Sequence, residues 1–133
     1  MTVDSMTSQR ILREIREMER DQAGISEFYK AEPVDNNLLL WTATLFGPPQ
    51  TNLEGKNVNV EIIIPQTYPF KPPKVRLLTQ VSSQFVHADG SICLDILNTA
   101  WSPALTIDRV LLSLLSVLTD SPIFRERLRR RAD

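Results

Sequence analysis

The stretch NVNVEIIIP, residues 57–65, decides the class of fold. Every second residue in it is apolar and β-branched: Val58, Val60, Ile62 and Ile64. This period of two predicts a strand with one buried face. NLLLWTATLF at residues 37–46 and KVRLLTQV at residues 74–81 have the same character, and a weaker strand is expected at residues 28–31. Joined by short turns, these segments predict an antiparallel meander of about four strands.

Two helices are expected to flank the meander. Residues 7–21 predict an amphipathic helix, with apolar residues at helical spacing: Ile11, Leu12, Ile15 and Met18. Its charged residues are expected on the other faces: Arg10, Arg13, Glu14, Glu17 and Arg20. Residues 106–120 predict a helix that is apolar around most of its circumference and therefore buried, with Thr106 as N-cap. Helix, meander, irregular segment and buried helix predict an α+β fold, in one domain over residues 1–133.

The composition excludes several functions. Lys and Arg number 15 and Asp and Glu 16, so the net charge of −1 creates no field that attracts nucleic acid or an acidic membrane. One cysteine and one histidine exclude an internal disulfide and leave too few ligands for an all-protein zinc site. The N-terminus lacks the apolar core of a signal peptide, and no apolar run is long enough to span a bilayer. We therefore expect a soluble, cytoplasmic protein whose thiol stays reduced.

Between the last predicted strand and the second helix lie about 25 residues without clear periodicity, an unusual length for so small a domain and typical of a functional loop. The segment contains His87 and Cys93, and Asp89-Gly90 predicts a tight turn just before the thiol. A lone cysteine can be a nucleophile, a ligand or a small buried hydrophobe. His87 could act as a base for Cys93 only if the two side chains met in space.

Three blocks of sequence resemble the core of ubiquitin-conjugating enzymes, in the order and spacing of that family. They are YPFKPPKV at residues 68–75, DGSICLDIL at residues 89–97 and WSPALTI at residues 101–107. The resemblance runs from about residue 8 to residue 120. It implies the family's fold and a domain without a cofactor.

The resemblance also implies the chemistry. Cys93 would accept the C-terminal glycyl group of ubiquitin or a ubiquitin-like protein from an activating enzyme, as a thioester. It would transfer that group to a substrate lysine, with a RING-type ligase. The alternative is a catalytically weak or inert ubiquitin-binding or scaffolding variant of the same fold. A cysteine hydrolase is a third class, with His87 as its base.

The sequence departs from the family at the loop before the cysteine. Where family members carry His-Pro-Asn, residues 83–85 are Ser-Gln-Phe, which puts Phe85 in the place of the asparagine. That asparagine is thought to support the loop and the oxyanion, and a phenyl ring cannot donate a hydrogen bond. We expect Phe85 to hold the cysteine loop against the core. The replacement donor is then sought among four neighbours: Ser83, Gln84, His87 and Asn98.

The C-terminus departs as well. Family members continue after the buried helix with a loop and two more helices, and the expectation here is a shortened end at residues 121–133. Asp120 is the nearest candidate for the acidic residue that the family often places in this loop. Asp95 matches the aspartate of the family's CLD and could orient the amine.

The resemblance further implies two partner surfaces. Leu77, Pro103 and Ala104 occupy positions where family members form a shallow apolar platform for RING-type ligases, although Leu77 could instead point inward from its strand. Arg10 and Arg13 fall where the family presents basic residues to the activating enzyme.

Overall fold

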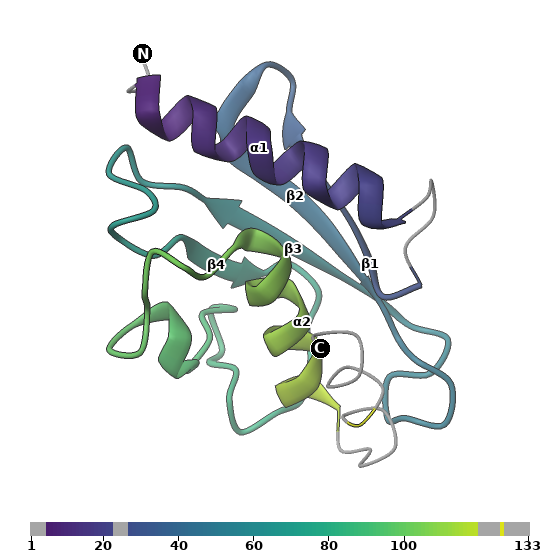
Figure 1. The fold of residues 1–133 in the computed structure, drawn as a ribbon. Coiled ribbons are helices and arrows are strands. Elements are labelled where there is room, and N and C mark those ends of the chain that lie inside the picture. Colours follow the sequence, from purple (N-terminus) through teal and green to yellow (C-terminus); the bar gives the residue numbers. More distant parts are fainter. Residues whose placement is uncertain (1–4, 23–26, 120–125, 127–133) are drawn as a thin grey trace.

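The computed structural model describes residues 5–22, 27–119 and 126. Helix α1 precedes a four-stranded antiparallel sheet with the order β1-β2-β3-β4, and helix α2 follows the sheet (Figure 1). The elements are α1 (Ser5–Gln22), β1 (Tyr29–Val34), β2 (Asn37–Phe46), β3 (Asn57–Ile63), β4 (Lys74–Leu77), the short 3-10 helix η1 (Asp95–Leu97) and α2 (Ile107–Leu118). The prediction of an α+β fold with a four-stranded meander is confirmed. The expectations for Asp120 and for the end of the chain lie outside the described residues.

The sheet buries one face, as the alternation predicts. The inward residues of β2 and β3 pair across the strands, with Trp41 opposite Ile62 and Leu45 opposite Val58. Their neighbours Thr42 and Ile63 are exposed. Helices α1 and α2 both lie over the inward face (Figure 1), and α2 contributes seven buried residues to the core. Burial of this helix is therefore confirmed, and so is its N-cap, because Thr106 Oγ1 accepts a hydrogen bond from the Arg109 amide at 3.2 Å.

Strand β4 is shorter than the predicted segment 74–81. Its ladder with β3 ends at Leu77. Just beyond, the Asn59 amide donates to the side-chain oxygen of Thr79 at 2.8 Å instead of to a backbone carbonyl. A side chain in the place of a backbone acceptor ends the regular ladder, which frees the chain to turn toward the cysteine segment.

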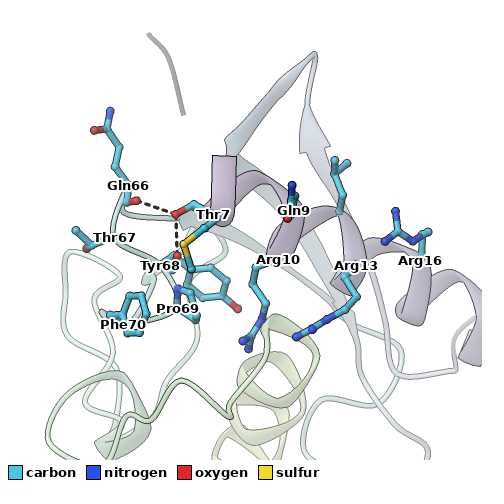
Figure 2. A pocket seen from close by; sticks show the side chains of 12 residues that line it. Thr7, Gln9, Arg10, Arg13, Arg16, Gln66, Thr67, Tyr68, Pro69 and Phe70 are labelled. Atoms are coloured by element: carbon cyan, nitrogen blue, oxygen red, sulfur yellow. Dashed lines mark hydrogen bonds between the residues drawn. The ribbon is translucent and has the colours of Figure 1, made fainter. Parts of the chain in front are cut away.

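The start of α1 is fixed to the loop between β3 and β4. Thr7 Oγ1 donates to the carbonyl oxygens of Gln66 and Tyr68, both at 2.9 Å (Figure 2). Thr7 is 4% exposed, so its single hydroxyl proton is shared between these loop carbonyls in a nearly dry environment.

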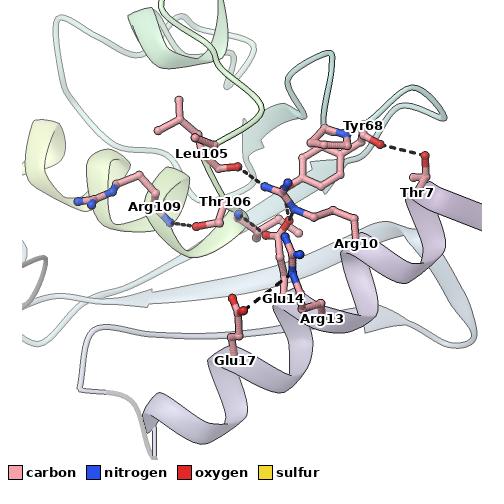
Figure 3. Close-up of polar contacts among 12 residues, drawn as sticks. Thr7, Arg10, Arg13, Glu14, Glu17, Tyr68, Leu105, Thr106 and Arg109 are labelled. Atoms are coloured by element: carbon pink, nitrogen blue, oxygen red, sulfur yellow. Dashed lines mark hydrogen bonds and ion pairs between the residues drawn. The ribbon is translucent and has the colours of Figure 1, made fainter.

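A buried carboxylate continues this contact along the helix. Glu14 is 2% exposed, although the sequence pattern assigns it to a charged face, and that assignment is wrong. Its carboxylate accepts hydrogen bonds from Arg10 Nε at 2.8 Å, from the Tyr68 hydroxyl at 2.5 Å and from the Ile107 amide at 2.8 Å (Figure 3). Burial, together with the charge and hydrogen bond of Glu14, raises the pKa of Tyr68 above its ordinary value, so Tyr68 donates as a neutral phenol.

We predict that Glu14→Ala lowers the free energy of unfolding by about 3–5 kcal/mol, because it leaves a half-buried guanidinium and two donors without their acceptor. Glu17→Gln is the matched control. Glu17 lies one turn on, 49% exposed and 3.9 Å from Arg13, and its loss should change stability by no more than about 0.5 kcal/mol. Urea denaturation at pH 7 measures both values. Equal stabilities for the two variants would contradict the role assigned to Glu14.

Candidate functional site

The segment before the cysteine is a tight hairpin, residues 85–93. The Cys93 amide donates to the Phe85 carbonyl at 2.8 Å, and the His87 amide donates to the Ser91 carbonyl at 2.9 Å. Between these two bonds, Val86 pairs with Ile92 in an antiparallel bridge. The segment without periodicity in the sequence thus has a defined register around the thiol.

The turn of this hairpin is locked against β4. Asp89 Oδ1 accepts hydrogen bonds from the Ser91 hydroxyl at 2.7 Å and the Ser91 amide at 2.9 Å, and these bonds lower the pKa of Asp89 below its ordinary value. Gly90 has φ +89, and a Cβ there would lie 2.4 Å from the Leu77 carbonyl oxygen. The Leu77 amide donates to the Gly90 carbonyl at 2.8 Å, and Arg76 pairs with Ser91. The last residues of β4 therefore hold the turn in place.

Cys93 lies at the end of the hairpin with an exposed side chain. This exposure excludes the interpretation of Cys93 as a small buried hydrophobe. After it comes η1, whose Ile96 and Leu97 pack against the core. The thiol is thus presented to solvent from a backbone that is anchored on both sides, an arrangement suited to attack on an acyl group.

Phe85 and Cys93 lie on the same face of the hairpin. Val86 and Ile92 pack against the core, so the flanking residues Phe85 and Cys93 point to the opposite face, because side chains alternate along paired strands. Val86 and Ile92 pack against the core and anchor the loop. Phe85 is half-buried and lies near Val117 and Leu118 at the end of α2, so its expected packing role stays a prediction.

Five candidates for supporting roles are described. Gln84, His87, Asp95 and Asn98 are exposed, whereas Ser83 is half-buried and its Oγ accepts a hydrogen bond from the Phe85 amide at 3.2 Å. His87 shares the face of Cys93 but is paired with Ser91, so the two residues are diagonal and not directly opposite neighbours. Among the described residues, the structure records no hydrogen bond between the His87 and Cys93 side chains. Asp95 and Asn98 follow the thiol along the chain, and the Asn98 amide donates to the Asp95 carbonyl at 3.0 Å. Within residues 5–22, 27–119 and 126, no group of three or more metal-ligating side chains gathers.

The two arginines predicted to face a partner differ in their surroundings. Arg10 is 14% exposed, donates to Glu14 and to the Leu105 carbonyl, the latter at 2.8 Å, and lies 5.7 Å from the centre of the Tyr68 ring. Its guanidinium joins α1 to the segment before α2 and is occupied inside the protein. Arg13 is 58% exposed, with only a loose 3.9 Å pair to Glu17, so it is available to a partner.

The predicted apolar platform of Leu77, Pro103 and Ala104 is exposed at two of its three residues. Leu77 is 5% exposed and belongs to the core, so the inward alternative is the one that the structure supports. Pro103 and Ala104 are exposed. Phe70, which the sequence analysis did not single out, is 68% exposed. The signal was present in the YPF of residues 68–70, an aromatic residue in a proline-rich loop outside any strand alternation.

Phe70 lies near the segment that carries Pro103 and Ala104. Trp101 Nε1 donates to the Pro69 carbonyl at 2.8 Å, and the Trp101 and Tyr68 rings are 5.9 Å apart. These contacts bring the two segments side by side at the end of the molecule where α1 begins.

A groove of about 730 Å³ runs between α1 and residues 66–70 of the loop that joins β3 to β4 (Figure 2). Its lining combines apolar side chains with arginines along one side of α1: Met6, Leu12, Phe70, Arg10, Arg13 and Arg16. The three apolar side chains are all exposed. A surface that mixes exposed apolar groups with positive charge is typical of a protein-binding site, with an acidic and apolar partner.

The comparisons with known proteins agree with this geometry. The family model of ubiquitin-conjugating enzymes matches residues 10–130. The structure of human ubiquitin-conjugating enzyme E2 G1 is similar with a TM-score of 0.81 and 27% identity, over 90% of this chain and 100% of that one. The E2 domain of a Toxoplasma gondii ubiquitin-conjugating enzyme is similar with a TM-score of 0.74 and 34% identity, over 84% of this chain and 73% of that one.

The chain belongs to the ubiquitin-conjugating enzyme family. Its fold is that of transferases which act in ubiquitin conjugation together with ubiquitin, an activating enzyme and a ligase. None of the helices in the described part of the chain combines the length and the apolar character that crossing a membrane requires.

We predict that Gly90→Ala destabilises the protein more than Gly55→Ala does. Both glycines have positive φ, +89 and +76, so an alanine costs about 1–2 kcal/mol at either position. Only Gly90 adds a clash, because the Cβ at Gly55 would meet nothing within 4 Å. Chemical denaturation of the two variants measures the difference, and equal losses would show that the turn does not rest tightly on β4.

Proposed function

We propose that Cys93 carries ubiquitin or a ubiquitin-like modifier as a thioester. The activating enzyme supplies the modifier, and a substrate lysine receives it, with a RING-type ligase as helper. The observation that carries this proposal is the exposed thiol at the anchored end of the hairpin, in a chain that belongs to this family.

The proposed reaction has two steps. In the first, the Cys93 thiolate attacks the thioester carbonyl that joins the modifier to the activating enzyme, whose own thiolate leaves. In the second, the lysine amine attacks the new thioester, the carbon–sulfur bond breaks, and Cys93 leaves as thiolate while the amine loses its proton. A thiolate suits both steps because it is a good nucleophile and a fair leaving group.

Side chains near the thiol are proposed to assist the second step. Asp95 is the candidate to orient the amine, while Gln84, His87 and Asn98 are the candidates to stabilise the oxyanion. Their exposed positions on the hairpin and around η1 support this assignment. Asp120 is kept as a proposal for the acidic residue beside the incoming lysine.

The partner surfaces are proposed from the groove and its rim. Arg13, with Arg16 beside it in the groove, is proposed to contact the activating enzyme, while Arg10 positions α1. Phe70, Pro103 and Ala104 are proposed as the ligase platform, and their exposure supports this. Leu77 is proposed to support the cysteine segment through its backbone, because its amide donates to the Gly90 carbonyl.

A catalytically weak or inert ubiquitin-binding or scaffolding variant is the second candidate. The observation that favours it is Phe85 in the place of the family's asparagine. The proposed compartment is the cytoplasm, where an exposed single thiol stays reduced. Nucleic acid and membrane are not among the proposed partners, since the net charge is −1.

We predict that incubation with an activating enzyme, ATP and ubiquitin-type modifiers gives an adduct that a reducing agent removes. Cys93→Ser should give an oxygen ester that survives the reducing agent, because an oxygen ester does not exchange with thiols, and Cys93→Ala should give no adduct. Gel electrophoresis with and without reducing agent measures the three proteins. An adduct on Cys93→Ala would contradict the proposal, whereas an inert variant would show no adduct on the wild-type protein either.

We predict that Arg13→Glu with Arg16→Glu slows the loading of Cys93, because the reversed charges repel the activating enzyme from the groove. Arg20→Glu with Lys30→Glu is the matched control, since both residues are exposed and lie outside the groove, and this variant changes the net charge by the same amount. Loading rates at low and high salt measure the effect, which salt should diminish. Equal slowing by the control would show that net charge, and not this surface, determines loading.

We predict that Phe70→Ala and Ala104→Asp spare loading but weaken ligase-stimulated discharge, because each removes apolar contact from the platform. Ile63→Ala is the control, since Ile63 is 46% exposed on the opposite face of the sheet. Single-turnover discharge with and without a cognate ligase measures the effect. Normal stimulation of the two platform variants would exclude these residues from the contact.

A further inference from the structure

Phe85 is the side chain that the hairpin sets opposite Cys93. The bond from the Cys93 amide to the Phe85 carbonyl and the bridge between Val86 and Ile92 put the two residues in register. Side chains that oppose each other in antiparallel strands have Cβ atoms about 4.5–5.5 Å apart on one face of the ladder. The side chain of Phe85 therefore starts next to that of Cys93, within reach of an acyl group attached to the thiol.

Phe85 also lies next to the end of α2. Phe85 is half-buried and lines a hollow of about 410 Å³ together with Val117, Leu118 and Asn52. Asn52 Nδ2 donates to the Leu118 carbonyl at 3.0 Å, which fixes the far wall of this hollow. Val86 and Ile92 take the core side of the hairpin, so Phe85 is the apolar side chain between the position of Cys93 and the end of α2.

We propose that Phe85 is a specificity-determining residue that shields the Cys93 thioester from water. This inference rests on the proposed function. It concerns the competition between two acceptors of the acyl group, a presented lysine amine and water.

The apolar side chain of Phe85 should slow hydrolysis of the thioester more than transfer to a lysine. In hydrolysis, a water oxygen bonds to the thioester carbonyl carbon, the carbon–sulfur bond breaks, and Cys93 leaves as thiolate. The modifier leaves as a carboxylic acid with one proton of the water, and the other proton passes to the thiolate or to solvent. An apolar side chain lowers the local density of water and offers no donor to the oxyanion that forms on this path. A lysine amine that a bound ligase or substrate holds in place does not depend on the local density of water. The apolar side chain of Phe85 therefore slows transfer to this amine less than it slows hydrolysis.

The asparagine of the family would do the opposite at this position. A carboxamide attracts water and can donate to an oxyanion, whereas a phenyl ring does neither. Phe85 should therefore give a long-lived loaded form whose discharge depends on a presented amine.

The test uses the single cysteine of the full chain. N-acetylglycine thiophenyl ester acylates Cys93 directly, with thiophenolate as leaving group and without an activating enzyme. Intact-mass spectrometry then follows loss of the acyl group in buffer. Phe85→Leu keeps a long apolar side chain and should hydrolyse at the wild-type rate. Phe85→Ala and Phe85→Val shorten the apolar side chain and should hydrolyse several-fold faster.

Folding is controlled by melting temperature. Phe85→Val keeps a residue that favours extended backbone, so it carries the test if Phe85→Ala does not fold. Phe85→Asn should hydrolyse faster still and should discharge to free lysine faster, by at most the roughly 100- to 1,000-fold effect of one oxyanion donor.

Wild-type hydrolysis rates for Phe85→Ala and Phe85→Val would overturn the proposal. This holds even if Phe85→Asn hydrolysed faster, because its rate would then reflect a gained hydrogen-bond donor and not the loss of a shield. A failure of the proposed function has a different signature. In that case the activating enzyme leaves Cys93 unmodified, while the chemically acylated protein still reports on Phe85.

Discussion

The Glu14 carboxylate is the interaction on which the arrangement of the molecule depends. It accepts hydrogen bonds from Arg10, from the Tyr68 hydroxyl and from the first amide of α2, and so joins three segments that are distant in the sequence. A buried charge is costly unless its oxygens are satisfied, and here three donors satisfy it. The positions of the groove, of Phe70 and of the start of α2 therefore depend on one side chain.

The thiol is held by a separate set of contacts. Gly90 rests against the Leu77 backbone, and Val86 and Ile92 fix the hairpin to the core. The reactive residue thus projects from a backbone that packing and hydrogen bonds define, while its own side chain stays exposed. This division leaves the face that carries Cys93 and Phe85 free to vary without loss of the fold, and it is on this face that the chain departs from its family.

Sequence patterns predicted the regular elements because burial on one face imposes a period, as in β3 and α2. They failed where the environment reverses the usual behaviour of a residue. Glu14 and Arg10 look like solvated charges and are in fact paired with each other inside the protein. Leu77 could have been placed inward from the alternation of KVRL, whereas the hairpin around Cys93 could not, because a single bridge between Val86 and Ile92 leaves no periodic signal.

The most direct test of the central claim is intact-mass spectrometry of the wild-type protein after incubation with activating enzyme, ATP and ubiquitin. We predict a gain of one modifier less one water, reversed by dithiothreitol and abolished when the thiol is alkylated beforehand. An adduct that resists dithiothreitol, or that forms on the alkylated protein, would contradict the assignment of Cys93 as the carrier.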